Sequence, residues 1–157
     1  KGVKLNPDLI EYRFANASDL PLEDRSIDFV FSNAVLEHVH KPKQVVKELA
    51  RVTKIGGLNA YEIDLRNHFS KSMPLRLLRY PNILWSIMTY YRPGYTNRLR
   101  LAYQPRIFDK YFTTELINIT RTLNDKIELH RIKVNKRFKN YSQNELCVLA
   151  FWILLSK

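Results

Sequence analysis

Hydrophobic and polar positions alternate in two short stretches near the start of the chain and run together in a third. Residues 9–15 and 58–65 alternate apolar and polar side chains, which is the period of a β-strand with one covered face. Residues 27–32 form a continuous β-branched and aromatic run, typical of a strand covered on both faces in a parallel sheet. The pattern therefore predicts three strands within residues 1–65.

Residues 43–53 repeat their apolar side chains with the period of an α-helix. Pro42 precedes this segment, where its missing N–H group costs little, and the Gly56-Gly57 pair follows it, as glycine often follows a helix end. The apolar positions on the predicted buried side are Val45, Val46, Leu49 and Val52. Because strands and a helix alternate in this order, we expect a parallel α/β sheet.

The second half of the chain begins with a segment rich in aromatic residues, prolines and arginines. We predict a helical insertion over residues 74–91, interrupted at Pro81 because proline breaks a helix interior. A further helix is expected over residues 105–112. The pattern then predicts strands over residues 115–122 and 146–156.

Residues 125–139 fit two patterns. Alternation at Ile127 and Leu129 favours a strand, whereas Leu129, Ile132 and Lys136 could share one side of a helix. We interpret the segment as a short helix.

The chain carries a formal net charge of +11. Such an excess indicates either an anionic partner, such as nucleic acid, an acidic membrane surface or a phosphorylated substrate, or a solubilising surface. The basic residues concentrate in residues 66–106 and 131–139. A partner would therefore meet the second half of the chain.

Cys147 is the single cysteine and lies in an apolar run. No disulfide can form within the chain, which favours a reducing compartment, and we expect a cytoplasmic protein. The longest apolar run, residues 146–155, is shorter than the roughly 20 residues that a bilayer span requires. No transmembrane segment is therefore expected.

Several short motifs stand at fixed spacing within residues 15–57. They are Leu20-Pro21, Asp28, Leu36-Glu37-His38, and Arg51-Val52 ahead of Gly56-Gly57. Through them the chain resembles the middle of class I S-adenosylmethionine-dependent methyltransferases of the type 11, ubiquinone/menaquinone-biosynthesis-like group. The resemblance implies a Rossmann-like α/β sheet with a helical insertion after strand five and an antiparallel last strand. It also implies S-adenosyl-L-methionine as the cofactor.

The chain departs from this family at its start. The family holds its cofactor with a glycine-rich turn after strand one and an acidic residue ending strand two, and the first residues of this sequence contain neither. We therefore expect an N-terminally truncated domain that lacks the first two strands, as a fragment of an enzyme or as a shortened protein that binds the methyl donor poorly. Strand four then exposes an edge, and the isolated chain should be marginally stable or associate.

The 157 residues suffice for one domain. We divide this single partial methyltransferase domain, residues 1–157, into three parts. Residues 1–65 form a cofactor-side βαβ core, residues 66–113 a helical lid or insertion, and residues 114–157 the C-terminal strands of the sheet.

Ligands of open parallel sheets bind at the carboxyl ends of the strands. By resemblance, Asn16 and Ala17 at the end of strand three would recognise the adenine edge. The family usually has aspartate there, and the Asn16 oxygen can still accept from the adenine amino group. Asn33 and Ala34 at the end of strand four would border the methionine part of the cofactor, so we expect both ends to converge on one pocket. The alternative is that these are ordinary turn residues.

Two histidines are candidates for catalysis. His38 stands at the Leu-Glu-His position, and its ordinary pKa near 6.5 suits a base at neutral pH. His68 follows strand five, where substrate-side residues often lie on this fold, and His40 is a further rival. A structural role is the alternative for each. No cysteine or histidine cluster has metal-ligand spacing, so no metal site is expected.

The arginines of the insertion are candidates for binding the acceptor. Residues 64–69 and 95–100 are similar to bacterial type 11 enzymes, several of which belong to cell-surface polysaccharide or lipid gene sets. This resemblance implies that the insertion is a lid, with Arg66, Arg98 and Arg100 available to bind a phosphate or carboxylate. The alternative is a packed lid with solvated arginines.

These observations support three functional hypotheses. The first is methyl transfer to a small-molecule, saccharide- or lipid-linked acceptor, which could be anionic. The second is a catalytically incomplete methyltransferase-like module that binds an anionic partner through its basic insertion. The third, methylation of nucleic acid, ranks last because the sequence lacks a base-flipping motif of the Asn/Asp-Pro-Pro-Tyr type.

Overall fold

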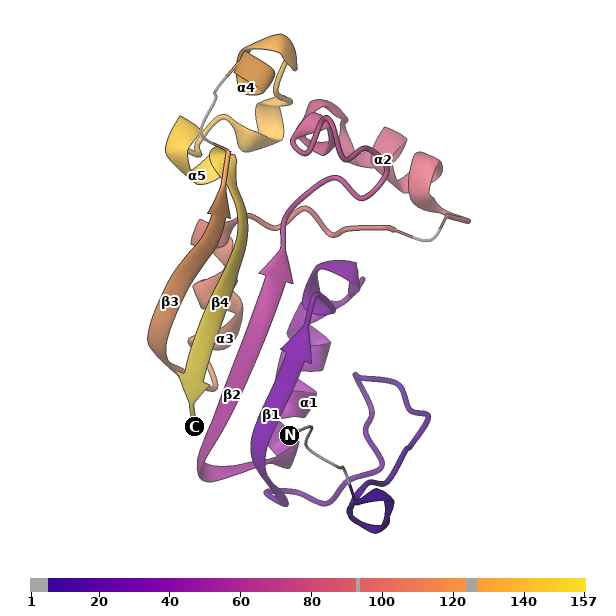
Figure 1. The fold of residues 1–157 in the computed structure, drawn as a ribbon, viewed down its shortest axis with the longest axis vertical. Coiled ribbons are helices and arrows are strands. Elements are labelled where there is room, and N and C mark those ends of the chain that lie inside the picture. Colours follow the sequence, from indigo (N-terminus) through magenta and orange to yellow (C-terminus); the bar gives the residue numbers. More distant parts are fainter. Residues whose placement is uncertain (1–5, 93, 124–126) are drawn as a thin grey trace.

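The computed structural model describes residues 6–92, 94–123 and 127–157. Its centre is a mixed four-stranded sheet with the strand order β1-β2-β4-β3 (Figure 1). β1 runs parallel to β2, and β4 is antiparallel to both of its neighbours. The strands are β1 (Ile27–Asn33), β2 (Thr53–Asp64), β3 (Thr113–Thr122) and β4 (Val148–Ser156). The parallel first pair and the antiparallel last strand confirm the expected fold class.

Two helices cover one face of the sheet, α1 (Pro42–Val52) and α3 (Gln104–Phe108), both behind it in Figure 1. The main core fills the space between them and the sheet, where the ring of Tyr61 stacks on that of Phe108 with centroids 5.7 Å apart. On the opposite face, the Phe31 ring contacts that of Trp152 and remains 59% exposed. The sheet therefore has one dry face and one largely open face.

The predicted helix over residues 43–53 is confirmed as α1, which passes directly into β2. The hydroxyl of Thr53, the first residue of β2, donates to the Leu49 carbonyl in the last turn of α1 at 2.7 Å. This hydrogen bond connects the end of the helix to the start of the strand. The glycine pair lies inside β2 instead of ending the helix. Gly56 has a φ of +76°, and a Cβ on Gly57 would lie 3.0 Å from the Asp28 carbonyl oxygen. Glycine is thus required where β1 and β2 approach closely.

A helical cap lies over the carboxyl ends of β1 and β2. It has its own small core, in which Trp85 packs with Leu77 and Phe138. The predicted break at Pro81 is confirmed, since a 3₁₀ turn at Arg76–Arg79 precedes it and α2 follows it. The regular helices of the cap are α2 (Asn82–Thr89), α4 (Ile127–Arg131) and α5 (Gln143–Cys147).

Several predicted boundaries change. The helix expected over residues 105–112 is the shorter α3, and the last strand begins at Val148. Ser142 and Glu145 form a reciprocal capping box that starts α5 just before it. The segment 125–139 contains α4 and a 3₁₀ turn at Lys136–Phe138, and its residues 125 and 126 lie outside the described residues.

The strand predicted over residues 9–15 is wrong. A 3₁₀ turn at Pro7–Leu9 is followed by an irregular segment, and Tyr12 and Phe14 are almost completely exposed. An alternating segment becomes a strand only beside a partner strand, and residues 9–15 pair with no strand in the described part of the chain.

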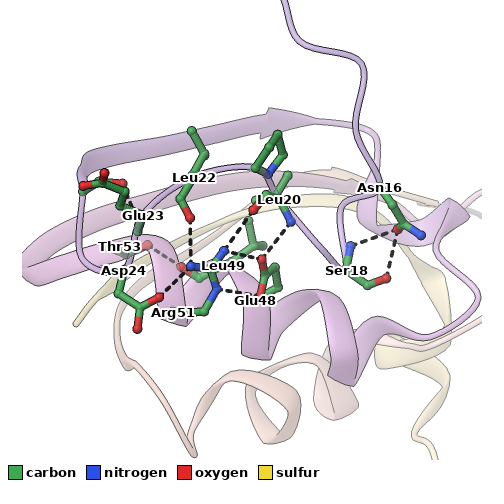
Figure 2. A network of polar contacts seen from close by, with 12 residues as sticks. Asn16, Ser18, Leu20, Leu22, Glu23, Asp24, Glu48, Leu49, Arg51 and Thr53 are labelled. Atoms are coloured by element: carbon green, nitrogen blue, oxygen red, sulfur yellow. Dashed lines mark hydrogen bonds and ion pairs between the residues drawn. The ribbon is translucent and has the colours of Figure 1, made fainter.

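The segment that follows is nevertheless held against α1 by Arg51 (Figure 2). The Arg51 guanidinium donates to the carbonyl oxygens of Leu20 and Leu22 and to the carboxylates of Asp24 and Glu48, at 2.6 to 3.0 Å. These charge-assisted bonds fasten an irregular loop at one helix residue.

Among the described residues, no helix combines the length and the apolar character that crossing a bilayer would require.

Candidate functional site

The carboxyl ends of β1 and β2 bring the two predicted histidines together. His38 belongs to a 3₁₀ turn shortly after β1, and His68 follows β2. Their rings meet edge to face with centroids 4.9 Å apart. Residues that are distant in sequence thus share the position at which open parallel sheets bind their ligands.

Glu37 lies beside this histidine pair and is the most unusual residue of the site. Its side chain is 1% exposed, and no hydrogen bond of good geometry reaches either carboxylate oxygen within the described residues. His38 Nε2 lies 3.8 Å from Glu37 Oε1. Burial raises the pKa of Glu37 from its ordinary value of 4.5 to about 7, and the negative charge of Asp64 adds to this effect.

The opposite holds for Asp64 at the end of β2. Burial disfavours its ionised form, but contacts with His68 and Arg66 outweigh burial and lower its pKa below the ordinary range. His68 Nε2 lies 3.6 Å from Asp64 Oδ2, and Arg66 donates to both carboxylate oxygens. The site therefore pairs an ionised carboxylate with one whose proton is retained to near neutral pH.

The segment after the cap helix α2 fixes the orientation of His38. Its Nδ1 lies 2.5 Å from the Tyr95 carbonyl oxygen, which can only accept, so Nδ1 carries the proton. Asn97 holds the same turn, because its backbone N–H donates to the Glu37 carbonyl and its amide donates to the Leu36 carbonyl. In the neutral ring, Nε2 is therefore the atom able to accept a proton.

Two cavities flank the histidine pair. One of about 490 Å³ is lined by polar groups of Asp64, Arg66 and His68. The other, of about 400 Å³, is lined by His38 and by Asn16 and Ala17 of the N-terminal loop. Because the two rings are in contact, the pair stands between the cavities.

The residues predicted to bind the cofactor do not share one pocket. Asn16 and Ala17 line the cavity beside His38, but Asn33 and Ala34 are absent from its lining. Asn33 is exposed at the end of β1, and Ala34 has a left-handed φ of 52°. The expected convergence of the two strand ends on one cofactor pocket stays a prediction.

The hydrogen bonding of Asn16 also differs from the expectation. Its Oδ1 accepts from the backbone N–H and the hydroxyl of Ser18, at 3.0 and 2.9 Å (Figure 2). That oxygen is therefore committed to its own loop. The amide nitrogen is the group that remains able to reach into the cavity.

The three predicted acceptor-binding arginines have different surroundings. Arg66 is bound to Asp64, lines a cavity and keeps 40% of its side chain exposed. Arg98 is buried but lines a third cavity. Arg100 is fully buried, and its guanidinium donates to the carbonyl oxygens of Leu65, Leu146 and Val148. Arg100 joins the sheet to the cap, so its burial corrects the expectation that it contacts an acceptor.

Glu37, His38 and His68 offer ligand atoms that all lie within 4.8 Å of one another. Spacing along the sequence gave no sign of such a group, because its members come from the ends of two strands. Carboxylate and imidazole ligands suit Zn²⁺ and similar divalent cations. The same three side chains could therefore either bind a metal ion or take part in proton transfer.

Sequence analysis missed Glu37, Asp64, Tyr95 and Asn97 as parts of the site. Glu37 was visible in the Leu-Glu-His motif, but its burial depends on the later segment that covers it. Tyr95 and Asn97 act through contacts with a turn about 60 residues away in sequence. No local pattern carries that information.

Comparison with known proteins places the first part of the chain in a sequence family. Residues 1–60 match the family described as a methyltransferase domain. An uncharacterized protein of Methanocaldococcus jannaschii is 42% identical over 64 residues, or 41% of this chain and 31% of that protein. A malonyl-(acyl-carrier protein) O-methyltransferase of Marinomonas is 48% identical over 46 residues, 29% of this chain and 17% of that enzyme. The chain thus spans less than a third of the curated relatives it matches.

Solved structures extend the likeness to nearly the whole chain. A SAM-dependent methyltransferase of Methanosarcina mazei superimposes with a TM-score of 0.58 over 94% of this chain and 66% of that one, at 20% sequence identity. At this identity the likeness establishes the fold. The mixed α/β fold of this chain is thus that of the solved methyltransferase.

Proposed function

We propose that this chain, whose residues 1–60 match a methyltransferase domain family, is a class I methyltransferase of type 11 and takes part in S-adenosylmethionine-dependent methyl transfer to a small-molecule acceptor. The observation that carries the proposal is the convergence of His38, His68 and Glu37 at the carboxyl ends of two parallel strands. Burial of a carboxyl group without a hydrogen bond costs free energy, and groups perturbed in this way cluster at functional sites.

The cavity beside His38 fits the adenine end of the cofactor. Its lining offers the Asn16 amide nitrogen as a donor to an adenine ring nitrogen, and Val39 and Val45 as apolar contacts. Glycines among the described residues do not line this cavity, so the ribose and amino-acid ends need other groups. When bound, the cofactor supplies a methyl group on a positively charged sulfur.

The histidine pair is the proposed proton acceptor. Neutral His38 presents Nε2 beside Glu37, and a hydroxyl acceptor placed against this atom could pass its proton to it as the acceptor oxygen is methylated. The Nε2 atom of His68, the second ring of the pair, lies 3.6 Å from the Asp64 carboxylate. Removal of the proton makes the acceptor oxygen a stronger nucleophile.

The acceptor is proposed to be saccharide- or lipid-linked. Support comes from the cavity on the His68 side, whose polar lining of Asp64, Arg66 and Lys71 suits a hydroxyl-rich compound. The aromatic cap over the strand ends supplies apolar surface for a linked chain. The cytoplasmic location expected from the single cysteine remains a prediction.

A cofactor-free binding module is the second candidate. It is favoured by the position of Asn33 and Ala34 outside the cavity of Asn16. Calorimetric titration with S-adenosylhomocysteine separates the two candidates. The methyltransferase proposal expects saturable heat, whereas the module expects none while polyanions such as heparin still bind.

A further inference from the structure

Two arginines of the cap share a single neutral acceptor. Arg98 Nη2 donates to Asn82 Oδ1 at 2.7 Å, and Arg137 Nη1 donates to the same oxygen. Their guanidinium groups are therefore no farther apart than two hydrogen bonds. No acidic side chain forms an ion pair with either arginine anywhere in the described ranges.

The position of Arg98 is fixed by its surroundings. The side chain is almost fully buried, and its Nη1 donates to the carbonyl oxygens of Leu77 and Tyr80 at 3.2 and 2.6 Å. Its guanidinium carbon lies 5.1 Å from the centre of the Trp85 ring and 5.7 Å from that of Phe138. Burial and the nearby positive charge of Arg137 lower the pKa of Arg98 to about 10.

The backbone of Arg98 is also strained, with a left-handed φ of 58°. Such a conformation is unfavourable for a residue other than glycine. The chain thus places a cation where its charge is disfavoured, its backbone is strained and a second cation is adjacent. An anion would relieve the electrostatic part of this cost.

A cavity of about 310 Å³ lies against these two arginines. Its lining includes polar groups from both sides of the cap: His40, Asn82, Tyr95, Asn97, Arg98 and Arg137. This size is at the lower end of small-molecule pockets, enough for a phosphoryl group with part of the compound that carries it.

The cavity adjoins the candidate site. His40 lines both this cavity and the one beside His38. The ring of His40 stacks on that of Tyr95 with centroids 4.1 Å apart, and the Tyr95 carbonyl accepts from His38. A ligand anchored by the arginines would therefore extend toward the histidine pair.

We infer that Arg98 and Arg137 form a phosphate-binding site, and that the phosphate is part of the acceptor. The exposed Arg137 guanidinium, the two Arg98 N–H groups left over by its bonds to Leu77, Tyr80 and Asn82, and a neighbouring imidazole suit a tetrahedral group with several oxygens and more than one negative charge better than a carboxylate. Phosphate binding stands independently of methyl transfer. The assignment of the phosphate to the acceptor rests on the proposed function.

The test is titration with inorganic phosphate at constant ionic strength, followed by ³¹P NMR and by thermal melting. The exposed Arg137 is changed in Arg137→Gln, which leaves the buried cap intact. Arg79→Gln is the matched control. Arg79 is exposed in the same cap, and its substitution removes the same charge. We expect saturable binding that weakens about tenfold or more in Arg137→Gln and is unchanged in Arg79→Gln.

Equal affinity in all three proteins, or no saturable binding to the unchanged chain, would overturn the phosphate site. If acetate bound as tightly as phosphate, the claim that the site prefers a phosphate group over a carboxylate would be wrong. A sugar 1-phosphate should bind at least about tenfold more tightly than inorganic phosphate if the group is part of the acceptor; equal affinity refutes that assignment. Failure to bind S-adenosylhomocysteine would refute the proposed methyl transfer alone.

Discussion

The Nε2 atom of His38 lies 3.8 Å from Oε1 of Glu37, a carboxylate oxygen buried without a hydrogen bond in the described structure. His38 Nε2 can accept a proton, whereas the Glu37 carboxyl group keeps its own proton to near neutral pH. The two residues are adjacent in sequence, yet their chemistry depends on the covering segment 95–97. The relationship between them determines how the site should respond to pH and to substitution.

Replacement of His38 by glutamine should slow methyl transfer by about 10²- to 10⁴-fold, the usual contribution of a positioned base. His130→Asn, on the exposed surface of α4, serves as the control. An unchanged rate and pH profile for His38→Gln would remove this residue from the chemistry.

Replacement of Glu37 by glutamine should change the pH dependence of stability. Because the folded pKa of about 7 exceeds the ordinary 4.5, the favourable protonated form is fully present below pH 4.5 and is lost as pH rises through 7. Glu37→Gln should therefore gain stability relative to the unchanged chain by up to about 3 kcal/mol between pH 4 and pH 8.

Urea unfolding at both pH values measures this difference. A stability difference between the two proteins that does not vary with pH would show that Glu37 titrates normally.

Chelation should leave methyl transfer unchanged, since the account assigns His38 and His68 to proton transfer. The measurement is the rate before and after dialysis against EDTA. Loss of activity that Zn²⁺ restores would instead show that Glu37, His38 and His68 bind a metal.

The open face of the sheet should make the isolated chain associate. Phe31 is 59% exposed there, and burial of one such ring contributes about 1.5 to 3 kcal/mol. Phe31→Ser should weaken self-association by about tenfold or more in sedimentation equilibrium. Ile83→Ser, which removes an exposed apolar residue from α2, is the comparison. Equal weakening by both substitutions would argue against a role for this face.

The sequence patterns that predicted β1, α1, β2 and β4 succeeded because each element carries its own periodicity. Residues 9–15 have the same kind of alternation but form no strand, since pairing depends on a neighbour that the pattern does not specify. The Pro81 break was predictable because proline acts locally on the backbone.

The site was predicted less completely than the fold. His38 and His68 were identified separately, and their contact follows from the parallel pairing of β1 and β2. Arg100 was misjudged because burial of an arginine depends on distant carbonyl groups, here on β4 and α5. Glu37 became a site residue only through the tertiary contacts that exclude water from it.

The most direct test of the central claim is a ¹H–¹⁵N NMR titration of the chain with S-adenosylhomocysteine. We expect saturable shifts at the amides of Ala17, Ser18 and His38, which line one cavity, and none along β3. Shifts confined to other parts of the sheet, or no shifts at saturating ligand, would contradict the assignment of this cavity to the methyl donor.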